Sequence, residues 1–111
     1  LGFDAIPYEE LAELGAAGFS ERVRGRVGDA PCFLSFDVDF VDPAFAPGTG
    51  TPEVGGPSSR QALGYLRALV GLDFRGFDCV EVSPPHDPSG VTAFLAANAC
   101  FEMLSLLALR R

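Results

Sequence analysis

The sequence predicts an α/β fold built around a parallel sheet. The order of predicted elements is helix, strand, helix, strand, helix, and alternation of this kind implies right-handed βαβ crossovers. The first predicted strand is apolar on both faces, which is typical of a parallel strand inside a sheet. With 111 residues, the chain is expected to form no more than one domain.

Composition excludes several classes of protein. The chain is 48% hydrophobic, so it is neither disordered nor fibrous. Its net charge of -7, with arginine as the only basic residue besides one histidine, argues against a nucleic-acid partner. Cys32, Cys79 and Cys100 form no CxxC motif, which indicates reduced thiols in a cytoplasmic protein. No basic-then-apolar signal peptide opens the chain, and its start at Leu1 suggests a fragment.

The N-terminal third is expected to contain a short edge strand over residues 1–6 and then two helices. Pro7 suits the first turn of a helix that Gly15 would end. Residues 17–27 carry apolar side chains at helical spacing, so they predict a second helix. The pair Gly28-Asp29 predicts a turn.

The middle of the chain predicts a strand, a long loop and a helix. The strand covers residues 32–38 and the loop covers residues 42–57, a length that is usually functional or disordered. Ser58, followed three residues later by Gln61, fits a capping box at the start of the helix. Its apolar stripe is expected to comprise Leu63, Leu66, Leu69 and Val70.

The C-terminal part predicts a second strand over residues 77–83 and a helix over about 89–110. The two prolines after the strand should stop it. Residues 92–109 are apolar enough to suggest a membrane span. Asn98, Glu102 and Ser105 interrupt them, so we expect a buried helix and no membrane partner.

Three acids are predicted at the carboxyl ends of the strands, where open parallel sheets bind ligands. Asp37 and Asp39 are two residues apart, so on a strand both side chains project to one face. Two adjacent carboxylates repel unless a cation compensates, and carboxylate oxygens suit Mg, Ca or Mn. Glu81 is expected on the second strand, opening at the same edge.

Other polar residues near this edge have weaker interpretations. Asp42, before Pro43, fits a turn, and Glu53 fits a solvated or structural loop position. His86 is the only histidine and follows two prolines, so it is a candidate substrate contact without a visible partner. The loop glycines lack the pattern of a phosphate cradle, and the chain has no lysine for a P-loop.

Two stretches resemble the ureohydrolases, the arginase and agmatinase superfamily. Ser35-Phe36-Asp37-Val38-Asp39, followed by Pro43, Pro47-Gly48 and Gly56, is similar to the third signature of that family. Residues 80–107, "VEVSPPHDPSGVTAFLAANACFEMLSLL", resemble the C-terminal strand and helix of its agmatinase branch. The resemblance covers residues 28–110 strongly and the first two dozen loosely.

The resemblance implies a three-layer α/β/α fold and hydrolysis of a guanidino compound to urea and an amine with two manganese ions. By position, it implies that Asp37 bridges both metals, that Asp39 chelates one, and that Glu81 pairs with the substrate guanidinium. His86 is a further substrate-binding candidate, although a tyrosine is common at this position in the family. The resemblance also implies a homo-oligomeric full-length protein.

Segments of the types Gly-Gly-Asp-His and Asp-Ala-His-x-Asp, which supply the other metal ligands of the family, do not occur in this sequence. The chain is therefore expected to be the C-terminal portion of a single ureohydrolase domain and to be inactive alone. Guanidinobutyrase, arginase, proclavaminate amidinohydrolase and formimidoylglutamase activities remain alternatives for the full-length protein. A non-catalytic binding or assembly module is a further alternative, although the intact Asp37, Asp39 and Glu81 weigh against it.

Overall fold

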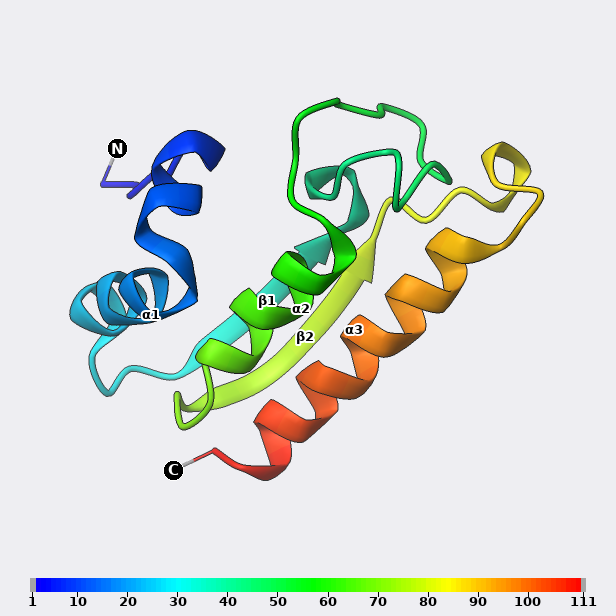
Figure 1. Cartoon of the computed structure of the whole chain (residues 1–111). Helices are drawn as coiled ribbons and strands as arrows, with labels where there is room; N and C mark the ends of the chain where they lie inside the picture. Colours follow the sequence, from blue (N-terminus) through cyan, green and yellow to red (C-terminus); the bar gives the residue numbers. More distant parts are fainter. Residues whose placement is uncertain (1, 111) are drawn as a thin grey trace.

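The computed structural model describes residues 2–110 and confirms the α/β class with a parallel strand pair. Figure 1 shows the elements in chain order. These are α1 (Tyr8–Val27), β1 (Cys32–Asp37), the 3₁₀ turn η1 (Val38–Phe40), α2 (Ser59–Ala68), β2 (Phe74–Val80), the 3₁₀ turn η2 (Pro84–His86) and α3 (Val91–Ala108). The connection β1–α2–β2 is the predicted crossover unit.

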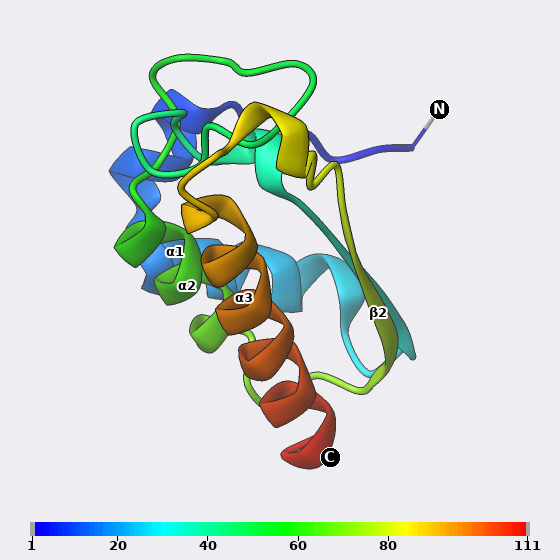
Figure 2. The same cartoon turned by 90° about the vertical axis from the view of Figure 1, so that its right-hand side faces the viewer.

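One side of the strand pair is covered by α2 and α3 (Figure 2). Phe36 of β1, Leu66 of α2 and Met103 of α3 are buried together there. A second, smaller cluster lies toward the other end of the strands and joins Phe74 with Leu106. These two clusters hold the helices against the sheet, because burial of apolar side chains is the main favourable term in folding.

The opposite side of the strand pair is open. Phe33 is 66% exposed there, and its ring lies over Gly76, its partner in β2. The alternation along β1 therefore divides the strand into a packed side and a solvent side. The expectation that both faces of this strand are buried is not met by residues 2–110 alone.

The first helix is bent where the sequence placed a boundary. Gly15 has φ 62° and ψ -176°, so it separates two helical segments inside α1, and Gly28 follows the second segment as predicted.

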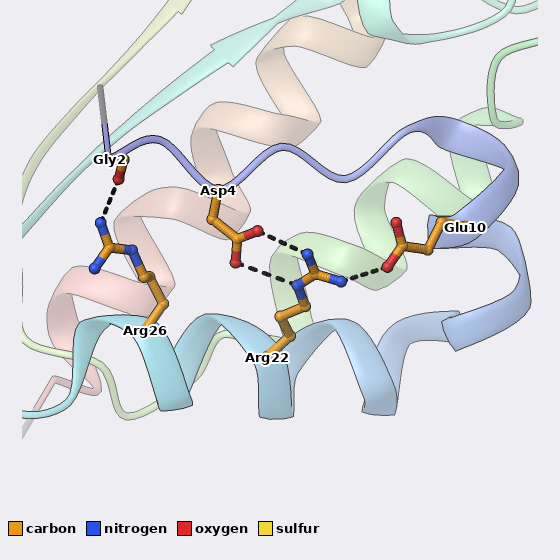
Figure 3. A network of polar contacts seen from close by, with 5 residues as sticks. All are labelled: Gly2, Asp4, Glu10, Arg22 and Arg26. Carbon is orange, nitrogen blue, oxygen red and sulfur yellow. Dashed lines mark hydrogen bonds and ion pairs between the residues drawn. The ribbon is translucent and has the colours of Figure 1, made fainter.

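The edge strand expected over residues 1–6 is wrong for residues 2–6, which form no strand, and residue 1 lies outside the described part of the chain. Charged and polar contacts hold this segment against α1 instead. Figure 3 shows the contacts, which join Arg22 to Asp4 and Glu10 and Arg26 to the carbonyl of Gly2.

The helix after the long loop begins as predicted. The Ser58 hydroxyl accepts a hydrogen bond from the Gln61 backbone N–H, and the Gln61 side chain accepts one from the Ser58 backbone N–H. The apolar face is partly different from the expected one. The buried members within the helix are Ala62, Tyr65 and Leu66, and Leu63 is half-buried. The helix ends at Ala68, and in the turn that follows Leu69 is buried whereas Val70 is 45% exposed.

The last helix, α3, is shorter than predicted at both ends, since Gly90, in a left-handed conformation, caps its N-terminus and the helix ends at Ala108. Within residues 2–110, α3 is the only helix that is long and apolar enough to cross a membrane. A core helix meets the same criteria, and six residues of α3 are buried in the packed side of the sheet.

Candidate metal centre

The predicted acids meet at one edge of the sheet. Asp37 is the last residue of β1 and pairs with Val80, the last residue of β2, so Glu81 follows directly beside it. Figure 1 shows the segments after both strands at this same end, beyond the arrowheads. The sheet register therefore places Asp37 and Glu81 at adjacent strand ends, where parallel sheets bind ligands.

The two aspartates lie close together for a different reason from the one predicted. β1 ends at Asp37, one residue earlier than expected, so Asp39 does not share a strand face with it. Asp39 lies in the 3₁₀ turn η1, and its backbone N–H donates a 2.9 Å hydrogen bond to Oδ1 of Asp37. Asp37 thus caps the turn that carries Asp39, while Val38, which separates them in the sequence, is fully buried in the apolar cluster.

The carboxylate of Asp39 is held by two hydroxyls from the loop. Thr49 Oγ1 donates to its Oδ1, and Thr51 Oγ1 donates to its Oδ2. Thr49 is only 2% exposed, whereas Thr51 is exposed. The orientation of the Asp39 side chain is therefore fixed by residues ten and twelve positions later in the chain.

The loop after η1 is closed by Asp42. Its Oδ1 accepts the N–H of Ala44 and its Oδ2 accepts the N–H of Gly55, both at 2.8 Å. These two N–H groups hold the pKa of the Asp42 carboxyl below its usual value. Gly56 packs against the start of the same loop, since a Cβ there would lie 2.5 Å from the carbonyl oxygen of Phe40.

The centre of the loop is tied to the segment after β2. The N–H of Gly48 donates to the buried hydroxyl of Thr92 at 2.8 Å, and its carbonyl accepts the N–H of Ser83 at 2.7 Å. Asp87, only 5% exposed, binds the hydroxyl of Ser89 and the N–H of Thr92. The Ser89 hydroxyl and then the Thr92 N–H lower the pKa of Asp87. The two segments around the site therefore form one hydrogen-bonded unit.

Glu81 is not on a strand, which corrects the prediction. β2 runs from Phe74 to Val80, three residues earlier than expected, so Glu81 directly follows the strand instead of lying on it. It has φ 67° and is the only residue other than glycine with a positive φ between residues 2 and 110. Such a conformation costs about 1–3 kcal/mol and is concentrated at functional sites.

The remaining predicted candidates lie at the periphery. His86 is exposed at the end of η2, with its backbone N–H on the carbonyl of Ser83. Glu53 is exposed in the loop.

Sequence reasoning missed Thr49 and Thr51, because the loop was tested only as a phosphate cradle. The useful signal was two hydroxyl residues separated by one glycine, shortly after an aspartate pair, in a loop rich in glycine and proline.

The site chemistry fits a hard divalent cation, although this chain supplies only part of its ligands. Carboxylate oxygens are ligands that Mn and Mg prefer. Within residues 2–110, no three His, Cys, Asp or Glu side chains are grouped so that they could hold one ion. Burial, and then the neighbouring Cys100, raise the pKa of the Cys79 thiol to about 11, so this cysteine stays protonated near neutral pH and is a poor ligand. Asp37 and Asp39 are thus the metal-binding candidates of this chain.

Comparisons with known proteins give matches over almost the whole chain. The model of the arginase family matches residues 1–105. Guanidinopropionase from Pseudomonas aeruginosa is 53% identical over 107 residues, which cover 96% of this chain and 34% of that protein. This chain therefore spans about a third of the length of that relative.

Solved structures give the same relationship in three dimensions. Proclavaminate amidino hydrolase from Streptomyces clavuligerus superposes with a TM-score of 0.93 at 45% identity, covering 96% of this chain and 36% of the other. A hypothetical agmatinase from Burkholderia thailandensis superposes with a TM-score of 0.91 at 46% identity, covering 96% and 34%. The strand pair, its helices and its loops thus correspond to about a third of each of these structures.

Proposed function

Since this chain belongs to the arginase family, we propose that the full-length protein that carries it is a manganese-dependent ureohydrolase. Such an enzyme hydrolyses a guanidino compound to urea and an amine. In this proposal residues 1–111 are the C-terminal part of one catalytic domain and supply a portion of its metal site together with the carboxylate that binds the guanidinium. The isolated chain is inactive, because two aspartates cannot fill the coordination spheres of two cations.

Asp37 and Asp39 are the residues of this chain that would hold the metal ions in this proposal. The observation that carries this proposal is their joint placement at the carboxyl edge of the sheet, where Asp37 Oδ1 accepts the N–H of Asp39. Each carboxylate keeps lone pairs that the described hydrogen bonds do not use. Divalent cations bound there would lower the pKa of a water molecule toward neutrality, which is the chemistry that hydrolysis of a guanidinium requires.

Glu81 is the proposed partner of the guanidinium. A carboxylate and a guanidinium match in shape and form paired, charge-assisted hydrogen bonds. Its carboxylate makes no hydrogen bond to any other residue between 2 and 110, so it is available to a ligand. The strained backbone at Glu81 supports a functional role, since strain persists where the surrounding structure holds a residue in place. By fixing the guanidinium, Glu81 holds its central carbon in the path of the attacking water.

The substrate we propose is a linear guanidino compound such as agmatine. Relatives at similar identity carry names that refer to guanidinopropionate, guanidinobutyrate and agmatine, so their names alone do not separate these substrates. The exposed His86 is proposed to lie near the tail of the substrate. Agmatine has a cationic tail, whereas guanidino acids have an anionic one. Comparing urea release from the three compounds would identify the tail that the full-length enzyme accepts.

The test separates the metal role from the substrate role in the full-length protein. We expect Asp37→Asn to lose bound manganese, measured by elemental analysis, and to lose activity as a result. Glu81→Gln should retain manganese and lose about a hundredfold in kcat/KM, because it removes the charge from a pair with the guanidinium. Glu53→Gln, on the exposed loop surface, is the matched control and should behave as the wild type.

Two results would overturn the assignment. The first is full manganese content and normal activity in Asp37→Asn. The second is urea release by the purified 111-residue chain above a blank containing manganese alone, since that would make the chain sufficient for catalysis.

A further inference from the structure

We propose that Thr49 and Thr51 are positioning residues that hold the Asp39 carboxylate in the orientation in which it binds a divalent cation. The inference rests on the proposed function, because it takes Asp39 to be a metal ligand. It concerns two hydroxyls that the aspartate motif does not include, and it assigns a role to the loop that follows that motif.

The contacts are suited to orientation rather than to ligation. An ionised carboxylate has about four lone-pair sites on two oxygens, and each threonine occupies one site on a different oxygen. One site on each oxygen remains for a cation. Two hydroxyls on opposite oxygens restrict rotation of the carboxylate group about its terminal bond, which one hydroxyl would do less well. Hydrogen bonds to metal-ligating side chains commonly act in this way.

Thr49 is itself held rigidly. It is 2% exposed, and the residue before it, Gly48, is bonded through its N–H to Thr92 and through its carbonyl to Ser83. A Cβ at Gly48 would lie 2.7 Å from the Cβ of Asp87 and 2.9 Å from the hydroxyl oxygen of Thr92, so the loop packs closely against the segment before α3 and against its first turn. The hydroxyl of Thr49 is therefore presented from a fixed backbone, and its position is set by α3 and by the segment after β2.

Thr51 differs from Thr49 in its surroundings. It is exposed, and its backbone N–H donates a hydrogen bond to Oγ1 of Thr49 with an N–O distance of 3.4 Å. Loss of its hydroxyl leaves no buried group without a partner, because water can replace it. A variant at Thr51 therefore changes the orientation of the Asp39 carboxylate with little effect on folding. A variant at Thr49 affects both that orientation and the stability of the fold.

The experiment measures manganese affinity of the full-length protein after removal of metal with a chelator. Mn²⁺ alone is titrated, and free Mn²⁺ is followed by its paramagnetic resonance signal. Thr51→Val is expected to weaken the affinity for one of the bound ions by about tenfold, and Thr49→Val with Thr51→Val by up to about a hundredfold. Thr49→Ser keeps the hydroxyl, so its manganese affinity should stay near that of the wild type. Ser105→Ala removes a hydroxyl that bonds only its own helix and is the control.

A second readout distinguishes positioning from substrate binding. At saturating manganese, Thr51→Val should have the KM of the wild type for the guanidino substrate. An unchanged manganese affinity in the double variant would overturn the inference, and so would a raised KM for Thr51→Val at unchanged manganese affinity. Asp39→Asn separates this result from the proposed function. If Asp39→Asn loses manganese while the double variant does not, only the inference fails, but if Asp39→Asn binds manganese normally, the ligand assignment fails with it.

Discussion

Two segments leave the sheet at the same edge and are held in different ways. The first connection, residues 38–58, carries Asp39, whose carboxylate is fixed by Thr49 and Thr51. The second connection, residues 81–90, begins with Glu81, whose backbone is strained and whose carboxylate makes no hydrogen bond to the other described residues. Each connection also contains an aspartate, Asp42 or Asp87, that accepts backbone N–H groups and shapes its loop.

The difference matches the two proposed tasks. A metal ligand must be oriented before the cation arrives, because reorganisation weakens binding. A carboxylate that pairs with a substrate must keep its acceptor sites free until the substrate enters. The carboxylate of Asp39 is therefore held by hydrogen bonds from within the first connection, whereas the carboxylate of Glu81, on a strained backbone, has no such bond from the described residues.

The largest expected effect tests how closely the first connection is packed. Gly56→Ala places a Cβ against the carbonyl oxygen of Phe40 and should lower the free energy of unfolding of the metal-free full-length protein by about 3 kcal/mol. In the second connection, Gly90→Ala meets no atom within 4 Å but strains a backbone at φ 72°, so about 1 kcal/mol is expected. Gly50→Ala, with open space and no positive φ, is the control for denaturant unfolding. Equal losses at Gly56 and Gly50 would contradict the packing described for the first connection.

The next effect concerns the hydroxyls on Asp39. Asp39→Ala removes the acceptor of the buried Thr49 hydroxyl and should destabilise the metal-free protein by about 2 kcal/mol, the cost of a buried group without a partner. Thr49→Val introduced together with Asp39→Ala should recover part of that loss, because the unpaired hydroxyl is then absent. A double variant no more stable than Asp39→Ala in denaturant unfolding would show that the hydroxyl is satisfied in another way.

In the second connection, an acid variant should have the opposite effect on stability. Glu81→Gly relieves the positive φ and is expected to stabilise the protein by about 1 kcal/mol while abolishing urea release. Glu53→Gly, at an exposed position without positive φ, should lose up to about 1 kcal/mol through the added freedom of the unfolded chain. The comparison between the two connections fails if both glycine variants lose stability.

The smallest expected effect is the loss of stability at low pH that comes from protonation of Asp87 in the second connection. Because the folded pKa of Asp87 is lowered, its contribution to stability is present above its unfolded value of about 3.9 and is lost as the pH falls through the folded value. Asp87→Asn should therefore be less stable than the wild type at neutral pH, and the two unfolding midpoints should converge on acidification. A constant difference down to the lowest measurable pH would assign the effect of the substitution to something other than the charge.

Much of the fold follows from local signals in the sequence. The capping box at Ser58 and Gln61 and the glycine at residue 15 located a helix start and a helix break, because both act within one turn of the chain. The strand limits were less predictable. Apolar character continues to Val82, but hydrogen bonding to β1 ends β2 at Val80, and only the paired strand sets that limit.

The sequence identified the acids of the candidate site as candidates. It did not indicate the residues that hold those acids in position. Asp37, Asp39 and Glu81 can be recognised as acids near strand ends. The bonds from Thr49 and Thr51 depend on how a loop of about fifteen residues folds back, and that path is set by Asp42, Gly48 and Thr92 together. A local sequence pattern does not indicate contacts between residues that are this far apart in the chain. The left-handed backbone of Glu81 was equally hidden, because glutamate rarely adopts it.

The most direct test of the central claim is anomalous diffraction at the manganese absorption edge, from crystals of the full-length protein grown with manganese and a guanidino ligand. We expect two manganese peaks, with the carboxylate of Asp37 coordinated to both and that of Asp39 to one, and the guanidinium on Glu81. Manganese peaks without contact to Asp37 and Asp39, or a guanidinium bound away from Glu81, would contradict the roles assigned to this chain.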